Sequence, residues 1–78
     1  MIKIHLSRIL GERRWTQAEL AKKTGIRPST INEMYHEIIE RVNLDYLDLI
    51  CEALDCEVSD ILEYIPNKQR RTGKDVLK

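Results

Sequence analysis

The chain has 78 residues, of which 42% are hydrophobic and 33% are charged, and its 13 Lys and Arg balance its 13 Asp and Glu. A chain of this length forms one domain that buries only about 60% of its extended surface, so dimerisation would add to its stability. The sequence has neither a signal peptide nor an apolar run that could span a bilayer, which predicts a cytoplasmic protein that binds no membrane.

The charges are unevenly distributed. Residues 1–35 hold seven Lys or Arg against three Glu, residues 36–64 hold one Arg against nine acids, and residues 65–78 hold five Lys or Arg against one Asp. A net charge of zero differs from the basic excess of strong nucleic-acid binders, whereas the basic first part suits a phosphate backbone. The acidic stretch is either a solvated face or an interface with a basic partner.

The first residues allow two interpretations. Residues 1–6 alternate apolar and polar side chains, which fits a short strand or the start of a helix. From Leu6 onward the apolar spacing is helical, with Ile9 and Leu10 on the same face. Trp15 follows, and we expect it to pack between the first two helices rather than to contact a ligand.

The stretch from Thr16 to Met34 carries the strongest local signals. Thr16 and Glu19 are three residues apart, which predicts a capping box at the start of a helix. Ala21 is small enough to let another helix cross closely. Gly25 then provides the left-handed residue that ends a helix at little cost.

A second short helix should open near Pro28, which has no N–H to donate and is tolerated in the first turn. Ile31 and Met34 are spaced to face inward. Outward positions are left to Arg27, Ser29, Thr30, Asn32 and Glu33. An exposed helix N-terminus with hydroxyl groups and an arginine suits phosphates and base edges.

This pattern resembles the helix-turn-helix of the Cro and phage-repressor (XRE) family. The spacing of Ala21, Gly25 and Ile31 is informative, because each has a mechanical role in the helix crossing. The remaining matches are Gln17, Leu20, Ile26, Thr30 and Met34. The resemblance covers about residues 6–65. It implies an all-α, lambda-repressor-like bundle of about five helices that places its second motif helix in the major groove of double-stranded DNA.

The segment after Tyr35 departs from that family, which commonly has a loop rich in Asn, Gly and Lys there. His36 and Arg41 are the only positions that we carry over as phosphate donors, while Glu37 and Glu40 would repel the DNA backbone. Alternatively, the second motif helix continues past Tyr35, so that the apolar residues that follow face the core or a second subunit.

Two further helices are predicted. Asn43 is a suitable N-cap for the fourth, and Asp55 tolerates the left-handed conformation that would end it. Its apolar stripe is Leu44, Leu47, Ile50, Cys51 and Leu54. Ser59 is expected to cap a short fifth helix that bears Ile61, Leu62 and Ile65 and stops at Pro66.

We therefore expect a DNA-binding domain over residues 1–66 and a basic, flexible tail over residues 67–78. The tail either improves solubility or forms an arm whose Arg70 and Arg71 add phosphate contacts.

The sequence offers little for catalysis. His5 and His36 lie in different segments, the three glycines stand apart, and Cys51 and Cys56 lack the spacing of a zinc site. We expect both thiols to be reduced packing residues. The prediction is a protein that is not an enzyme and has no metal, cofactor or small-molecule ligand.

The predicted function is sequence-specific regulation of transcription. Gln17, beside Thr16 at the start of the first motif helix, should hold a phosphate, and Arg27 and Thr30 should add backbone contacts. Ser29 and Glu33 are the candidates for base edges, with Asn32 a weaker one. The complete predicted DNA-binding set is Thr16, Gln17, Arg27, Ser29, Thr30, Glu33, His36 and Arg41.

One such domain covers few base pairs, so we expect a homodimer on half-sites about 34 Å apart. The fourth and fifth helices and residues 38–42 are the expected interface. The alternative is a protein-binding adaptor or anti-regulator that keeps the bundle but does not bind DNA, in line with the zero net charge.

Overall fold

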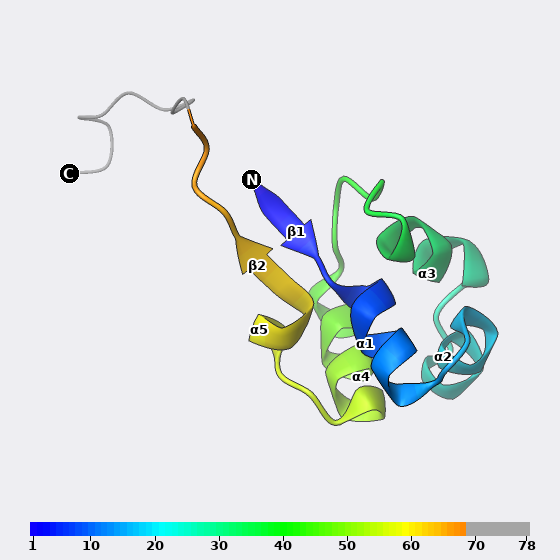
Figure 1. Ribbon diagram of the computed structural model, residues 1–78. Helices are drawn as coiled ribbons and strands as arrows, with labels where there is room; N and C mark the ends of the chain where they lie inside the picture. Colours follow the sequence, from blue (N-terminus) through cyan, green and yellow to red (C-terminus); the bar gives the residue numbers. More distant parts are fainter. Residues whose placement is uncertain (69–78) are drawn as a thin grey trace.

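Five short helices and one pair of antiparallel strands make up residues 1–68, the part of the chain that the computed structural model describes (Figure 1). In chain order they are β1 (Ile2–Ile4), α1 (Leu6–Arg13), α2 (Gln17–Thr24), α3 (Pro28–Tyr35), α4 (Leu44–Leu54), α5 (Val58–Ile61) and β2 (Leu62–Tyr64). The predicted five-helix fold class is confirmed, with the small sheet as an addition to it. The predicted tail lies outside the described residues from position 69 onward.

The helix boundaries around α2 and α3 follow the local sequence signals. The Thr16 hydroxyl accepts the Glu19 N–H at 3.1 Å, and the Glu19 carboxylate accepts the Thr16 N–H at 2.8 Å, as the capping box requires. Gly25 ends α2 with φ of 79°, and Pro28 occupies the first turn of α3. The alternative of a longer α3 is wrong, because the helix stops at Tyr35.

The core is built from every helix and from β1. Its largest fully buried side chains are Leu6, Ile9, Leu10, Leu20, Ile31, Met34, Ile50, Leu54 and Ile61. Trp15 is half-buried and packs against this core. Leu44 does not belong to it, contrary to the predicted stripe: it is the first residue of α4 and is exposed, because no element of the described chain covers it there.

The last predicted helix is shorter than expected. α5 begins after Glu57 rather than after Ser59, and the Glu57 N–H is capped by the Asp60 carboxylate at 2.9 Å. The chain becomes extended at Leu62, and Ile65 is not helical either. The reason is tertiary, since β1 offers this segment a strand partner from the opposite end of the described chain.

The two strands pair in a defined register. Ile2 lies opposite Tyr64, Lys3 opposite Glu63 and Ile4 opposite Leu62. The strand interpretation of residues 1–6 is therefore correct. In Figure 1 the strands lie on the opposite side of the molecule from α2.

The loop between α3 and α4 is tied to β1 by Glu37, which has a left-handed backbone with φ of 60°. Its carboxylate accepts the Ile4 N–H at 3.0 Å and lies 3.6 Å from the Lys3 ammonium. These contacts lower the pKa of Glu37, the hydrogen bond from Ile4 most strongly. Glu37 is thus directed at β1, not at a surface where it would repel DNA.

Candidate nucleic-acid interface

The two motif helices form a corner that is packed inside and polar outside. The inner side chains are Leu20, Ala21, Ile26, Ile31 and Met34, all buried. The Thr24 hydroxyl stiffens the turn, because it donates to the Leu20 carbonyl at 2.8 Å and accepts the Ile26 N–H at 3.2 Å. α2 and α3 therefore keep a set angle between them.

One hydrogen bond also joins the outer surfaces of these helices. The Asn32 side-chain amide on α3 donates to the Gln17 side-chain oxygen at the start of α2, over 3.2 Å. This contact uses the oxygen of Gln17 and leaves its NH₂ group available to an acceptor. Sequence reasoning treated Asn32 only as a weak base contact, and nothing in the spacing indicated this pairing.

A groove runs between α2 and α3. Gln17 and Lys22 line it from α2, and Arg27 and Ser29 line it from the turn and the start of α3. Lys22 was not predicted as a site residue, although its position one turn after Ala18 places it on the same face. Within residues 1–68 neither Lys22 nor Arg27 takes part in an ion pair. The groove therefore presents two cationic side chains that no carboxylate of residues 1–68 pairs with.

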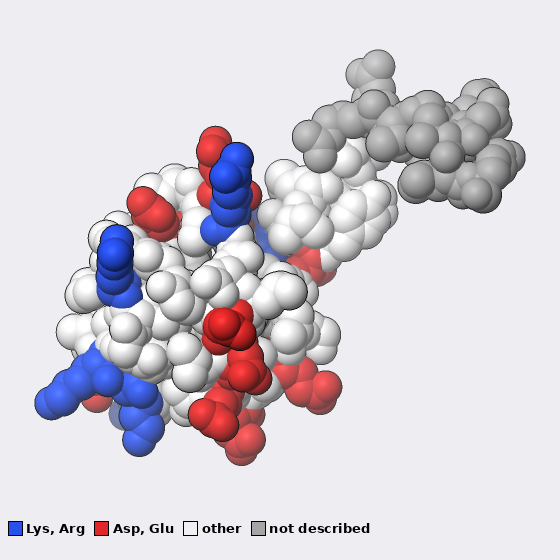
Figure 2. Space-filling view, turned by 180° about the vertical axis from the view of Figure 1, so that it is seen from behind, with Lys and Arg blue, Asp and Glu red and all other residues white. Residues whose placement is uncertain are grey.

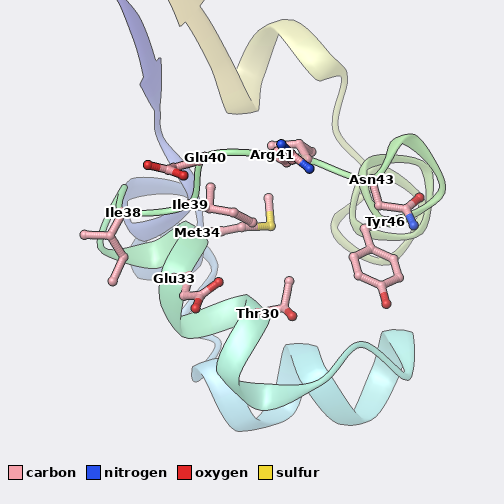
Figure 3. A pocket seen from close by; sticks show the side chains of 10 residues that line it. Thr30, Glu33, Met34, Ile38, Ile39, Glu40, Arg41, Asn43 and Tyr46 are labelled. Carbon is pink, nitrogen blue, oxygen red and sulfur yellow. The ribbon is translucent and has the colours of Figure 1, made fainter.

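A second groove lies on the other side of α3 (Figure 3). Thr30 and Glu33 line it from α3, Glu40, Arg41 and Asn43 from the loop, and Tyr46 from α4. Glu40 therefore stays at this groove, where its carboxylate lies beside Arg41 in the chain. Asn43 caps α4 by accepting the Asp45 N–H at 2.8 Å, as predicted. Its NH₂ group and the Tyr46 hydroxyl add donors to this groove, which the sequence pattern did not indicate.

Six of the eight predicted site residues line the two grooves, and Thr16 and His36 lie outside both. Gln17, Arg27 and Ser29 line the first groove, and Thr30, Glu33 and Arg41 line the second. Thr16 lies at the α2 N-terminus, where the first N–H groups of the helix have no partner within it. His36 follows α3, with its ring edge-on to Tyr35 at 5.0 Å between centroids, and lines neither groove.

The acidic part of the chain forms a separate surface. Exposed carboxylates of α4 and of the segment that follows it are Asp45, Asp48, Glu52, Asp55 and Glu57. Figure 2 shows one group of acidic side chains gathered together, while other acidic side chains lie near Lys and Arg elsewhere on the surface. The charge separation seen in the sequence is therefore preserved in part in space.

The two thiols are packing residues. Cys51 and Cys56 are free, half-buried and in contact with the core, and the Cys56 N–H donates to the Cys51 carbonyl at 3.0 Å. Burial raises the pKa of both thiols, that of Cys56 to about 11. Residues 1–68 contain no group of three or more potential metal ligands. No described helix combines the length and apolar character needed to cross a membrane.

Comparison with known proteins gives one consistent result. A family model for the Cro/C1-type HTH DNA-binding domain matches residues 5–67. The HTH-type transcriptional regulator YozG of Bacillus subtilis (strain 168), itself uncharacterized, is 32% identical over 61 residues, which is 78% of this chain and 73% of YozG. The crystal structure of the transcriptional regulator VanUg superposes with a TM-score of 0.69 at 31% identity, over 85% of this chain and 87% of VanUg.

Proposed function

The chain belongs to the Cro/C1-type helix-turn-helix DNA-binding domain family, and we propose that it regulates transcription by placing α3 in the major groove of a specific operator. Membership of this family confirms the predicted resemblance and agrees with a role that is not enzymatic. The observation that carries the proposal is the position of α3 between two grooves. The first is lined by donors from α2 and the turn, and the second holds the donors of Arg41 and Asn43 together with two carboxylates, those of Glu33 and Glu40.

The dimensions of DNA explain why two flanking grooves matter. The major groove is about 12 Å wide, close to the 10–12 Å diameter of an α-helix, so a helix inserted there has one phosphate backbone on each side. On one side of α3 the donors come from Gln17, Lys22 and Arg27, and on the other side from Arg41 and Asn43. Each strand of the duplex would contact its own set of donors.

Phosphate contacts set the register of the protein on DNA. The Gln17 NH₂ group and the unpaired N–H groups after Thr16 would bind one phosphate, with the positive end of the α2 dipole beside it. Arg27 and Thr30 would bind the backbone near the start of α3. Arg41 would bind the opposite strand, and His36, exposed at the end of α3, is a further donor.

Base contacts come from the exposed face of α3. Ser29 and Glu33 are one helical turn apart and both exposed, so they would reach base edges on the same side of the helix. A glutamate in the major groove accepts from the N4 amino group of cytosine and disfavours the other bases. Ser29 can donate or accept.

We also propose a homodimer on a pseudo-palindromic operator. A single α3 reads few base pairs, and a two-fold dimer doubles the number of contacts on half-sites about 34 Å apart. The small core adds a second reason, because burying more surface stabilises a domain of this size.

The experiment compares two classes of variant by fluorescence anisotropy, after the operator has been selected from a random DNA pool. Ser29→Ala and Glu33→Gln should relax preference at individual base pairs by about 1–3 kcal/mol. Gln17→Ala and Arg41→Ala should weaken all sites alike and lower the salt dependence by about one phosphate contact each. Arg8→Ala removes a charge from α1 instead and serves as the control.

One outcome would favour a different function. If the protein binds no random duplex at low salt, DNA binding is lost and the acidic face becomes the functional surface (Figure 2). The chain would then act as an adaptor for a basic protein partner. Equal effects of both variant classes at every site would instead refute the assigned roles of the individual residues.

A further inference from the structure

Glu37 has a backbone conformation that suits glycine better than glutamate. Its φ of 60° lies in the left-handed region, where a residue with a Cβ is strained and glycine is not. Residues held in such conformations cluster at functional sites, where the surrounding contacts maintain them. The side chain of Glu37 makes two contacts that a glycine at this position could not make, one with Ile4 and one with Lys3.

The contact with Ile4 lies at the open edge of β1. The His5 N–H donates to the Ile61 carbonyl at 2.7 Å, on the side of β2. Successive N–H groups of a strand point to opposite sides, so the Ile4 N–H points away from β2. Ile4 is buried, and the Glu37 carboxylate accepts this N–H at 3.0 Å. Without Glu37, a backbone donor of a buried residue would lose the partner that it has within residues 1–68.

Charge strengthens this contact. The Glu37 carboxylate lies 3.6 Å from the Lys3 ammonium, and both side chains are 36% exposed. The hydrogen bond from Ile4 and the charge of Lys3 lower the pKa of Glu37, so the carboxylate is ionised at neutral pH. A hydrogen bond to an ionised acceptor is about twice as strong as one between neutral groups.

The backbone of the same residue closes the end of α3. The Glu37 N–H donates to the Met34 carbonyl at 3.2 Å, and the Ile38 N–H donates to the Glu33 carbonyl at 2.9 Å. Such bonds end a helix around a left-handed residue. Glu37 thus terminates the helix that is proposed to enter the major groove, and its side chain attaches that end to β1.

Arg41 is carried by the loop that begins at Glu37. Figure 1 shows this loop, in green, passing beside β1 before it enters α4. Ile39 and Val42 pack against the core before and after Arg41 in the chain, while Arg41 itself is exposed. The Glu37 contact with Ile4 therefore fixes the start of the loop, and the two apolar contacts fix the part that carries the arginine.

We propose that Glu37 is a positioning residue for DNA binding, which uses β1 as an anchor to hold the end of α3 and Arg41 in the geometry that a duplex requires. The proposal rests on the proposed function and adds a residue that acts through others, since its own carboxylate is directed at β1. It also gives the two-stranded sheet a part in DNA binding, because the sheet supplies the donor.

The dimensions of the complex explain why such an anchor matters. An α-helix of 10–12 Å diameter fits a major groove about 12 Å wide with little clearance. A charge-assisted hydrogen bond to a phosphate is only about 2.7–2.9 Å long. A loop that shifts relative to α3 would therefore lose the proposed phosphate contact of Arg41, even in a protein that remains folded.

Two variants separate the side chain of Glu37 from its backbone. Glu37→Gly removes the carboxylate but suits φ of 60°, so the melting temperature should stay within about 5 °C while affinity for the selected operator falls roughly 10-fold. Glu37→Gln keeps an oxygen that can accept the Ile4 N–H, and it should bind within about 3-fold of the unaltered protein. Fluorescence anisotropy and circular dichroism melting measure the two quantities.

Asp55→Gly is the matched control. Asp55 also has a left-handed backbone, with φ of 52°, and it lines neither the grooves beside α3 nor the groove beside β1. The change relieves the same kind of strain and removes one negative charge, as Glu37→Gly does. Operator affinity should therefore stay within about 2-fold of the unaltered protein.

A double-mutant cycle distinguishes positioning from a general effect on stability. The combined loss from Glu37→Gly and Arg41→Ala should be at least about 3-fold smaller than the product of the two single losses, because both changes affect one phosphate contact. Glu37→Gly and Gln17→Ala act on opposite sides of α3, so their losses should multiply. A residue needed only for folding would lower the melting temperature and give the same result in both cycles.

The outcomes are distinct. The positioning role is overturned if Glu37→Gly binds the operator as tightly as the unaltered protein, if its affinity falls only in step with its melting temperature, or if Asp55→Gly loses as much. If the unaltered protein binds no DNA, the proposed function itself fails, and the positioning role fails with it.

Discussion

The corner of α2 and α3 and the two-stranded sheet are built in opposite ways. The corner uses contacts within about 20 residues of chain, from the Thr16 capping box to the buried Met34. The sheet joins segments that are far apart, as in the contact of the His5 ring with the Glu63 carboxylate at 2.6 Å, across 58 positions. The corner is therefore specified largely by contacts between residues that are close in the sequence, whereas the sheet depends on contacts between the two ends of the described chain.

The two regions should differ in stability for the same reason. Local opening requires less free energy where few apolar side chains are buried. The inner side chains of the corner are almost fully buried, whereas half of the apolar face of the sheet is exposed. We therefore expect the sheet to open before the corner, and the following changes test that difference.

The largest effect should come from removing buried volume at the corner. Ile31→Ala deletes part of a fully buried side chain and should lower the free energy of unfolding by about 2–5 kcal/mol. Ile2→Ala, on the exposed end of the sheet, should change it by no more than about 0.5 kcal/mol in dilute protein. Urea unfolding measures both. Similar losses would show that the sheet is as essential to the fold as the corner.

The second effect concerns the turn of the corner. Gly25→Ala should cost about 1–2 kcal/mol, because the backbone has φ of 79° while the added Cβ meets no atom within 4 Å. Gly11→Ala is the matched control in α1, where the added Cβ is also unobstructed and alanine favours the helix by about 1 kcal/mol. Thermal melting should shift in opposite directions for the two variants. A stabilising Gly25→Ala would contradict the left-handed turn.

The third effect lies on the outer surface of the corner. Asn32→Ala removes the donor that orients Gln17 and should weaken binding to all DNA sites by about 0.5–1.5 kcal/mol, with little change in melting temperature. The double variant with Gln17→Ala should bind no worse than Gln17→Ala alone, because both changes remove the same hydrogen bond between Asn32 and Gln17. If Asn32→Ala changes base preference instead, Asn32 contacts a base directly.

The smallest effect tests the attachment of the sheet to the loop. The pKa of Glu37 is lower in the folded protein than its usual value of 4.5, so its ionised form adds stability above that pH. This contribution disappears as the pH falls through the folded pKa. Glu37→Gln should therefore flatten the dependence of melting temperature on pH below about 5, slightly, because the group is exposed. Glu52→Gln on the acidic face is the control, and an identical pH profile for both would refute the Glu37 tie.

The accuracy of the sequence predictions follows the same division. The capping box, the Gly25 turn, the start of α3 at Pro28 and the Asn43 cap were predicted correctly, since each depends on neighbouring residues. The errors concern the start of α5, the extended conformation at Leu62 and the exposure of Leu44. Each of these features depends on whether another element of the folded chain lies beside the segment.

In the candidate site, too, some features could be predicted from the sequence and others depend on tertiary contacts. The predicted site residues include three that line each of the two grooves beside α3: Gln17, Arg27 and Ser29 in the first, and Thr30, Glu33 and Arg41 in the second. The sequence could not indicate that Asn32 would bond to Gln17, or that Asn43 and Tyr46 would face Thr30 across the second groove. Those contacts cross between elements, and their distances depend on how the helices pack.

The sequence by itself determined where the motif helices begin and end, which side chains they bury and which they expose. Local hydrogen bonds, backbone preferences and helical spacing are sufficient for that. Only the tertiary structure decided that residues 62–64 pair with residues 2–4 and that Glu37 turns toward β1. The pairing of two strands and the hydrogen bond of a carboxylate both require partners that lie close in space. Packing of the helical core is what brings these distant segments together.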